Sequence, residues 1–166
     1  MASVNKNFDS VGGFSVSDKT LINELYDVKN ANSVEIKNSF YSDSNTSNYI
    51  LRGLNTAILQ LDNVGTQIPL QSSTVSFITG HILGVNPAGT VFSGKLESTV
   101  YCNGLGATTV LSSMLTIIKD DIPSGETWDI EPFGGTNQFS YTTTRAGTVE
   151  NIKWAVSTQV VSIEWA

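Results

Sequence analysis

The residues of this chain that could do chemistry are few and are spread along the sequence. Asp129 and Glu131 flank Ile130 in a run with strand character, so both side chains point to the same face of a strand. Two carboxylates at this spacing resemble the acid pair of a glycoside hydrolase. We favour a solvated strand face, because 166 residues are few for the long groove of a polysaccharide depolymerase.

His81 is the single histidine, and it lies between Gly80 and Ile82 in another strand-like run. A histidine that acts as a general base needs a nucleophile and an orienting acid, and no Gly-x-Ser-x-Gly motif marks a serine. We therefore expect a hydrogen-bonded histidine in a sheet or an interface. Cys102 is the single cysteine, which excludes an intrachain disulfide and indicates a small buried side chain.

Oxygen ligands for a metal are present on expected loops, at Asp43, Asn45 and Asp62–Asn63, without the twelve-residue calcium loop and its terminal glutamate. Asp120–Asp121 adjoin at an expected turn, and Gly134–Gly135 lacks the lysine and serine or threonine of a phosphate-binding loop. The sequence thus predicts no catalytic, metal or cofactor residues and no enzymatic activity.

Sugar recognition is an alternative that the tyrosines keep open. Tyr41, Tyr49, Tyr101 and Tyr141 lie near Asn, Asp or Thr residues. An exposed tyrosine ring beside such groups can stack on a sugar ring and bind its hydroxyls. Cross-strand aromatic packing accounts for the same tyrosines equally well. A host surface glycan is therefore one partner to consider.

The composition is polar but poor in charge. Only 14% of the residues are charged, against roughly 25% in an average soluble domain. The chain has 20 Ser, 18 Thr and 14 Asn, which suit turns and the solvent-facing rows of strands. Low charge also suits close packing of identical copies in an assembly, although an ordinary β-rich surface has the same composition.

The charge pattern and the hydropathy exclude two classes of partner. The net charge is −6 and the lysines are scattered, whereas nucleic-acid binding relies on clustered Lys and Arg. No run approaches the roughly 20 apolar residues of a membrane span. The first nine residues are polar, which predicts no secretory leader and synthesis in a cytoplasm.

Short runs of alternating apolar and polar residues dominate the sequence after residue 48. Strands are expected at Ser73–Gly84, Val91–Cys102, Ala107–Lys119, Glu126–Glu131, Gln138–Thr144 and, with a break near Ser157, Val149–Trp165. Turn residues cluster at Asn86–Gly89, Asn103–Gly106, Asp121–Gly125, Gly134–Asn137 and Arg145–Gly147. This spacing predicts an all-β fold, a jelly-roll-like antiparallel β-sandwich over residues 49–166.

The expected core contains large apolar side chains from several of these strands: Phe77, Trp128, Phe139, Ile152 and Trp154. Trp165 lies at the end of the sequence, where it can instead fix the terminus to a neighbouring subunit.

Residues 1–48 are expected to form an extended N-terminal arm with short strands. Phe8 and Phe14 in a polar stretch broken by Gly12–Gly13 suggest that residues 1–15 dock on another protein, and a disordered terminus is the alternative. Residues 38–48 read as a polar loop, after which strand character returns.

Two interpretations compete for residues 14–38. The first is a helix that begins at Ser17 or Asp18. The second is a set of short strands at Phe14–Val16, Thr20–Ile22 and Ser33–Ile36. We favour the strands, because Asn and Asp recur between them and supply turn chemistry.

Two parts of the chain resemble bacteriophage virion proteins. The segment from Phe77 to Ala166, with Phe77–Ile82, Trp128–Ile130 and Ile152–Ala155, resembles the C-terminal domain of tail fibres and short structural proteins of marine phages. The run Tyr49–Thr56 followed by Leu59–Asp62 is similar to segments of cyanophage-type structural proteins.

The resemblance implies a non-enzymatic protein of the virion surface, either a short fibre or a decoration protein. It further implies a homotrimer whose residues 1–15 attach to other virion proteins while the sandwich projects outward. A trimer also suits an open sandwich physically, because the edge strands of its sheets need to be shielded.

Overall fold

The computed structural model describes residues 14–16, 19–22, 31, 33–37 and 40–165, and each regular element in those ranges is a strand. The chain divides into two compact units, the first ending at Asn32 and the second beginning at Ser33. In the first unit, β1 (Phe14–Val16) and β2 (Lys19–Ile22) pair antiparallel. The prediction that residues 1–15 dock on another protein concerns residues that lie almost entirely outside the described ranges.

The extended interpretation of residues 14–38 is confirmed where the structure describes the chain. Both β1 and β2 lie on segments expected to be strands, and β3 (Ser33–Lys37) covers the third such segment. Residues 17, 18, 23–30, 32 and 38 lie outside the described ranges.

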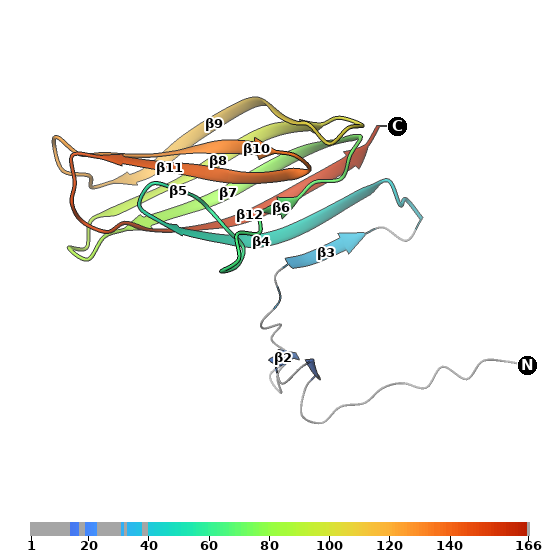
Figure 1. Cartoon of the computed structure of the whole chain (residues 1–166), viewed down its shortest axis with the longest axis horizontal. Coiled ribbons are helices and arrows are strands. Elements are labelled where there is room, and N and C mark those ends of the chain that lie inside the picture. The colour runs from blue at the N-terminus through green and yellow to red at the C-terminus, as the bar shows by residue number, and fades with distance from the viewer. Residues whose placement is uncertain (1–13, 17–18, 23–30, 32, 38–39, 166) are drawn as a thin grey trace, which may run out of the picture. The chain divides into compact units, whose positions relative to one another are not determined.

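The second unit is an antiparallel β-sandwich, as the sequence predicts (Figure 1). Its larger sheet has six strands in the order β3, β4 (Ser44–Leu54), β12 (Lys153–Glu164), β7 (Thr74–Val85), β8 (Val91–Cys102) and β9 (Thr108–Asp120). Its smaller sheet contains β10 (Thr127–Gly135), β11 (Gln138–Ala146), β5 (Ala57–Ile58) and β6 (Ile68–Pro69). The jelly-roll connectivity stays a prediction.

The C-terminal strand β12 lies in the middle of the larger sheet. It pairs with β4 on one side and with β7 on the other along almost its whole length. The break expected near Ser157 is wrong, because this residue pairs with both Ile50 and His81. Its exposed hydroxyl side chain fits the polar outer row of an uninterrupted strand.

The polar loop expected at residues 38–48 is also wrong in part. β4 begins at Ser44, and its first residues pair with β3 and with β12. Polar residues enter the sheet here because their backbones are paired on both sides, while the buried Ser47 side chain faces the interior. The domain boundary expected between residues 48 and 49 falls inside β4.

Aromatic side chains fill the space between the two sheets. Trp154 makes edge-to-face contacts with Phe92 and Trp128, with ring centroids 5.9 and 6.2 Å apart. The predicted core residues Trp128, Phe139, Ile152 and Trp154 are buried. Phe77 is not, since 48% of its surface is exposed and its neighbour Ile78 occupies the inward position of β7.

Two glycines of β7 make room for these rings. A Cβ atom at Gly84 would lie 2.7 Å from Cζ3 of Trp154, and one at Gly80 would collide with the hydroxyl of Tyr141. Burial raises the pKa of Tyr141, so its hydroxyl stays protonated and accepts a 3.3 Å hydrogen bond from the buried Thr158.

Candidate functional site

The inner face of the larger sheet changes from apolar to polar along three neighbouring strands. From the apolar end, β12 carries Trp154, Val156, Thr158, Val160, Ser162 and Glu164. In the same direction β4 carries Gly53, Leu51, Tyr49, Ser47 and Asn45. β7 carries Gly84, Ile82, Gly80, Ile78, Ser76 and Thr74. Because paired residues share a face, the three polar ends form one polar region.

This polar region lines a cavity of about 430 Å³. β3, β4 and β12 contribute most of the lining, and the segment from Pro69 to Gln71 forms part of the wall. The lining residues Glu35, Lys37 and Asp43 are exposed, so solvent reaches the cavity. Its volume lies within the range of roughly 300–1,000 Å³ that is typical of sites for small molecules.

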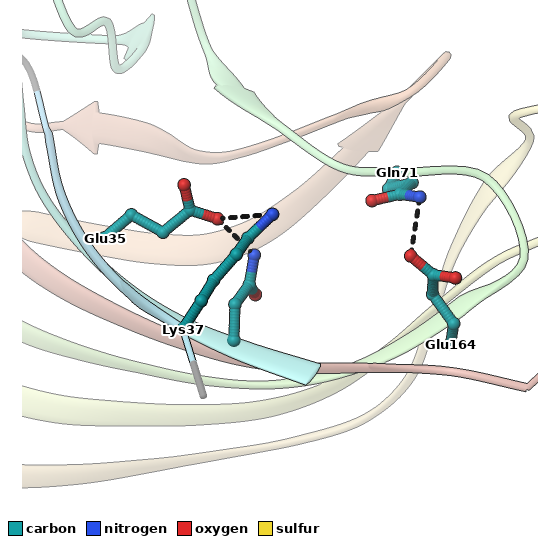
Figure 2. A network of polar contacts seen from close by, with 5 residues as sticks. Glu35, Lys37, Gln71 and Glu164 are labelled. Carbon is teal, nitrogen blue, oxygen red and sulfur yellow. Dashed lines mark hydrogen bonds and ion pairs between the residues drawn. The ribbon is translucent and has the colours of Figure 1, made fainter. Parts of the chain in front are cut away.

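One side of the cavity is built by β3 and β4. Lys37 is the register partner of Asn45. Glu35 is the register partner of Ser47, which is the next residue of β4 on the same face. The amide of Asn45 donates a 2.6 Å hydrogen bond to Oε1 of Glu35, and Nζ of Lys37 lies 3.3 Å from the same oxygen. Glu35 is thus held by two neighbours through one oxygen, and its second oxygen has no hydrogen-bond partner among the described residues (Figure 2).

The other side is built by the end of β12 and the segment before β7. Nε2 of Gln71 donates a 2.7 Å hydrogen bond to Oε1 of Glu164 (Figure 2). The hydroxyl of Thr74 donates to the carbonyl of Gln71 at 2.6 Å, and the backbone N–H of Glu164 donates to the carbonyl of Asp43 at 2.8 Å. The first contact joins the Gln71 and Glu164 side chains, the second holds the backbone of Gln71, and the third ties the loop before β4 to β12.

Hydroxyl groups complete the lining. Ser162 lines the cavity and shares a 2.7 Å hydrogen bond with Ser76, its register partner on β7. Ser33, Ser44 and Ser47 add further hydroxyls to the wall. The cavity therefore offers carboxylates, amides and hydroxyls, with the half-buried Tyr49 at its apolar border.

The charge of the cavity is negative. Among the described residues, three carboxylates line it, from Glu35, Asp43 and Glu164, against the single ammonium group of Lys37. Lys37 is already paired with Glu35. Carboxylate oxygens only accept hydrogen bonds, so the cavity suits a ligand that brings donors.

Three of the residues that the sequence singled out meet in this cavity. Asp43 and Asn45 were considered as metal ligands, and Tyr49 was considered as a sugar platform. Sequence reasoning missed Glu35, Lys37, Gln71 and Glu164. A signal existed for Glu164, since Val160, Ser162 and Glu164 follow one another at the two-residue period of a single strand face.

The acid pair and the histidine lie elsewhere and apart from each other. Asp129 and Glu131 share the outer face of β10, opposite Thr144 and Thr142 of β11. Asp129 accepts a 2.8 Å hydrogen bond from the backbone N–H of Ile130. His81 is exposed on the outer face of the other sheet, so the three do not form one site.

Two further acidic residues on loops, Asp62 and Asp121, have local partners. Asp62 accepts hydrogen bonds from the backbone N–H groups of Val64 and Thr66, at 3.0 and 3.1 Å. The Thr66 side chain is the largest cause that lowers the pKa of Asp62. Asp121 forms a 2.8 Å ion pair with Lys119. Within the described residues, no three His, Cys, Asp or Glu side chains are grouped so that they could hold a metal ion.

The other tyrosines differ in exposure. Tyr141 is fully buried, so it is no sugar platform and its assignment is corrected to the core. Tyr101 stacks on Trp165 with ring centroids 5.7 Å apart, so Trp165 packs on its own chain while half of its surface stays exposed. Tyr41 is exposed, and Cys102 is buried as expected.

Comparisons with known proteins add one structural likeness. No family model and no curated protein matches the sequence. One solved structure that matches is the tailspike protein gp49 of Acinetobacter baumannii bacteriophage Fri1, a capsular polysaccharide depolymerase, with a TM-score of 0.37 and 12% identity. The match covers 77% of this chain and 19% of the tailspike chain, so this chain spans about a fifth of that protein. In the ranges that the structure describes, no helix is long and apolar enough to cross a membrane.

Proposed function

We propose that this chain is a non-enzymatic structural protein of a bacteriophage virion, a short fibre or decoration protein that works as a homotrimer. In this proposal residues 1–15 attach it to other virion proteins, and the sandwich lies on the virion surface. The virion setting is taken from the sequence resemblance. We do not extend the depolymerase activity of the Acinetobacter phage tailspike to this chain.

The observation that supports an assembly role is the apolar outer face of the six-stranded sheet. Phe77 and Val161 are register partners there, with 48% and 45% of their surfaces exposed. Ile163 and Val75 form the next pair on the same face, and Tyr101 lies opposite Val75 on the adjoining strand. Contiguous apolar surface of this kind is typical of protein interaction sites.

The edge strand β9 gives a second reason for self-association. It is 13 residues long and pairs with β8 on one side, while no strand of the described residues pairs with its other side. Leu111, Met114 and Ile118 of this strand are exposed. A long apolar edge offers unpaired backbone groups to another chain, and packing of identical subunits is one way to cover it.

Light scattering of the full chain tests the oligomer. We expect a mass of about 53 kDa, three times the 17.8 kDa of the chain. Val161→Lys places a charge in the apolar outer face and should lower that mass, whereas Thr144→Lys, on the exposed face of β11, should not. A wild-type chain that stays monomeric at micromolar concentration would contradict the trimer.

Labelling of virions with an antibody against this chain tests the virion setting separately. We expect label on intact particles, either at the tail in a few copies or over the capsid in many. Particles that contain the gene product but bind no antibody would contradict surface placement, and particles without the chain would contradict the virion role.

A second candidate function is recognition of a carbohydrate on the host surface. The polar cavity on the inner face of the larger sheet favours it, because amides, carboxylates and hydroxyls surround a space of small-molecule size. The two functions are compatible, since the cavity and the apolar outer face lie on opposite faces of the same sheet.

A further inference from the structure

We infer that the cavity between β3, β4, β12 and the segment Pro69–Gln71 binds a saccharide without acidic groups. The inference rests on the second candidate function and adds to it the site, the residues that make contact and the charge of the ligand. The sequence suggested sugar binding on exposed tyrosines, whereas we assign it to this one cavity.

The hydrogen-bonding groups of the cavity determine the kind of ligand. Oε1 of Glu35 and Oε1 of Glu164 already accept hydrogen bonds from Asn45 and Gln71, and within the part of the chain that the structure describes the other oxygen of each carboxylate is available. For the carboxylate of Asp43, no side-chain partner is seen among the described residues. Acceptors therefore predominate, and a ligand must bring several O–H or N–H donors to satisfy them.

A neutral sugar meets this requirement. Each sugar hydroxyl can donate one hydrogen bond to a carboxylate. It can also accept a hydrogen bond from a remaining amide N–H group of Asn45 or Gln71, or from a lining serine. Hydrogen bonds to ionised carboxylates are the stronger kind, so Asp43 and Glu164 are expected to contribute most to affinity. Tyr49 adds an apolar surface at the border of the cavity.

The same charges select against acidic sugars. A uronic acid, a sulfated sugar or a phosphate brings negative charge and acceptor oxygens to a site that already contains three carboxylates. Among the described residues that line the cavity, Lys37 carries the one ammonium group, and it lies 3.3 Å from Glu35. Like charges placed together are an effective means of rejecting a wrong ligand.

The cavity is also prepared before any ligand arrives. Gln71 is held through Thr74 and Glu164, and Asn45 is held through Glu35. Because these polar side chains are fixed by neighbours on paired strands, binding requires less ordering than binding to a mobile loop would.

The test is an NMR titration of the full chain, labelled with ¹⁵N, with methyl glycosides of glucose, galactose, mannose and N-acetylglucosamine. The matched probes are the methyl glycosides of the four corresponding uronic acids, in which a carboxylate replaces the hydroxymethyl group. At about 10 mM sugar, a ligand with a Kd of about 1 mM fills most of the sites. We expect at least one neutral glycoside to shift the amide signals of Asn45, Gln71 and Glu164, and its uronic acid counterpart to bind about tenfold more weakly or not at all.

Two cavity variants and two controls complete the design. Asp43→Asn and Glu164→Gln keep the shape of each side chain and remove its charge, and we expect each to weaken binding about tenfold. Asp129→Asn and Glu131→Gln make the same chemical changes on the outer face of β10 and should leave binding unchanged.

Three results would overturn the inference: no shift with any glycoside, shifts confined to residues outside the cavity, or equal affinity for a neutral sugar and its uronic acid. A mass measurement on the same sample reports the oligomeric state independently. A failed titration with a trimeric mass would remove the saccharide site and leave the virion proposal standing.

Discussion

The two ends of the sandwich interior use the same three strands for different purposes. At one end, β4, β7 and β12 present Leu51, Ile82 and Val156 to the opposite sheet, and the space is filled. At the other end, the same strands present Asn45, Thr74 and Glu164 to a cavity. The backbone pairing continues across both ends, while the inward side chains change from apolar to polar.

This difference separates stability from binding. Apolar contacts at the filled end stabilise the sandwich, since about 25 cal/mol is gained per Å² of apolar surface buried. At the polar end, several side chains are held by hydrogen bonds to their neighbours. Substitutions at the two ends should therefore differ in their effect on the free energy of unfolding.

Trp154→Ala should produce the largest loss, about 3–5 kcal/mol in the free energy of unfolding. The side chain is buried, contacts Phe92 and Trp128, and donates a 3.1 Å hydrogen bond to the carbonyl of Asn55. Urea denaturation followed by tryptophan fluorescence measures the change. Trp165→Ala is the matched control, because half of that ring is exposed and its stack on Tyr101 accounts for about 1 kcal/mol. Equal losses in the two variants would contradict the assignment of Trp154 to the core.

Gly80→Ala should reduce the free energy of unfolding by about 1–3 kcal/mol, because the added methyl group overpacks the interior. The new Cβ atom would collide with the hydroxyl of Tyr141. Tyr141→Phe removes that oxygen, so Gly80→Ala should be better tolerated in the Tyr141→Phe background than alone. A double-mutant cycle by chemical denaturation measures this coupling, and strictly additive effects would show that the two residues are not in contact.

Glu164→Gln should change the free energy of unfolding by less than about 0.5 kcal/mol. The new amide oxygen can still accept the hydrogen bond from Gln71, and one of three carboxylates in the cavity loses its charge. Thermal unfolding measures the change. A loss as large as that of Trp154→Ala would mean that the polar end is part of the structural core.

The smallest effect is expected at Asp62. Its carboxylate accepts hydrogen bonds within its own loop, whereas the carboxylate of Asp43 in the cavity has no side-chain partner among the described residues. The folded pKa of Asp62 is lowered below 3.8, first by the Thr66 side chain and then by backbone N–H groups. A lowered pKa contributes stability above the unfolded value, and that contribution is lost as the pH falls through the folded pKa. A pH titration of the Asp62 carboxyl signal by NMR should give a midpoint below 3.8, and Thr66→Ala should move it upward. An unchanged midpoint in Thr66→Ala would show that the Thr66 side chain is not the cause.

The strands of the sandwich could be predicted well because the alternation of apolar and polar residues and the positions of the turn residues give the same boundaries along the chain. Val91–Cys102 was expected with the bounds that β8 has, since Asn86–Gly89 and Asn103–Gly106 mark both of its ends. Where polar residues enter a strand, the prediction failed. Ser44 to Asn48 looked like a loop, but tertiary pairing with β3 and β12 overrides local preference there.

The site was harder to predict than the fold. The sequence predicts Phe77 in the core, but Phe77 and Ile78 follow one another in β7, and only the sheet decides that Ile78 points inward. Glu35, Gln71 and Glu164 are far apart in sequence and meet only because β12 returns to lie beside β4. No local motif joins them, so nothing short of the strand order could bring them together.

An experimental structure of the full chain with the neutral glycoside that gives the largest NMR shifts would test the central claim most directly. The account predicts a sugar ring in the cavity, with hydroxyls on the carboxylates of Asp43 and Glu164 and on the amide of Asn45. A ring bound on another surface, or a cavity closed by its own side chains, would contradict it.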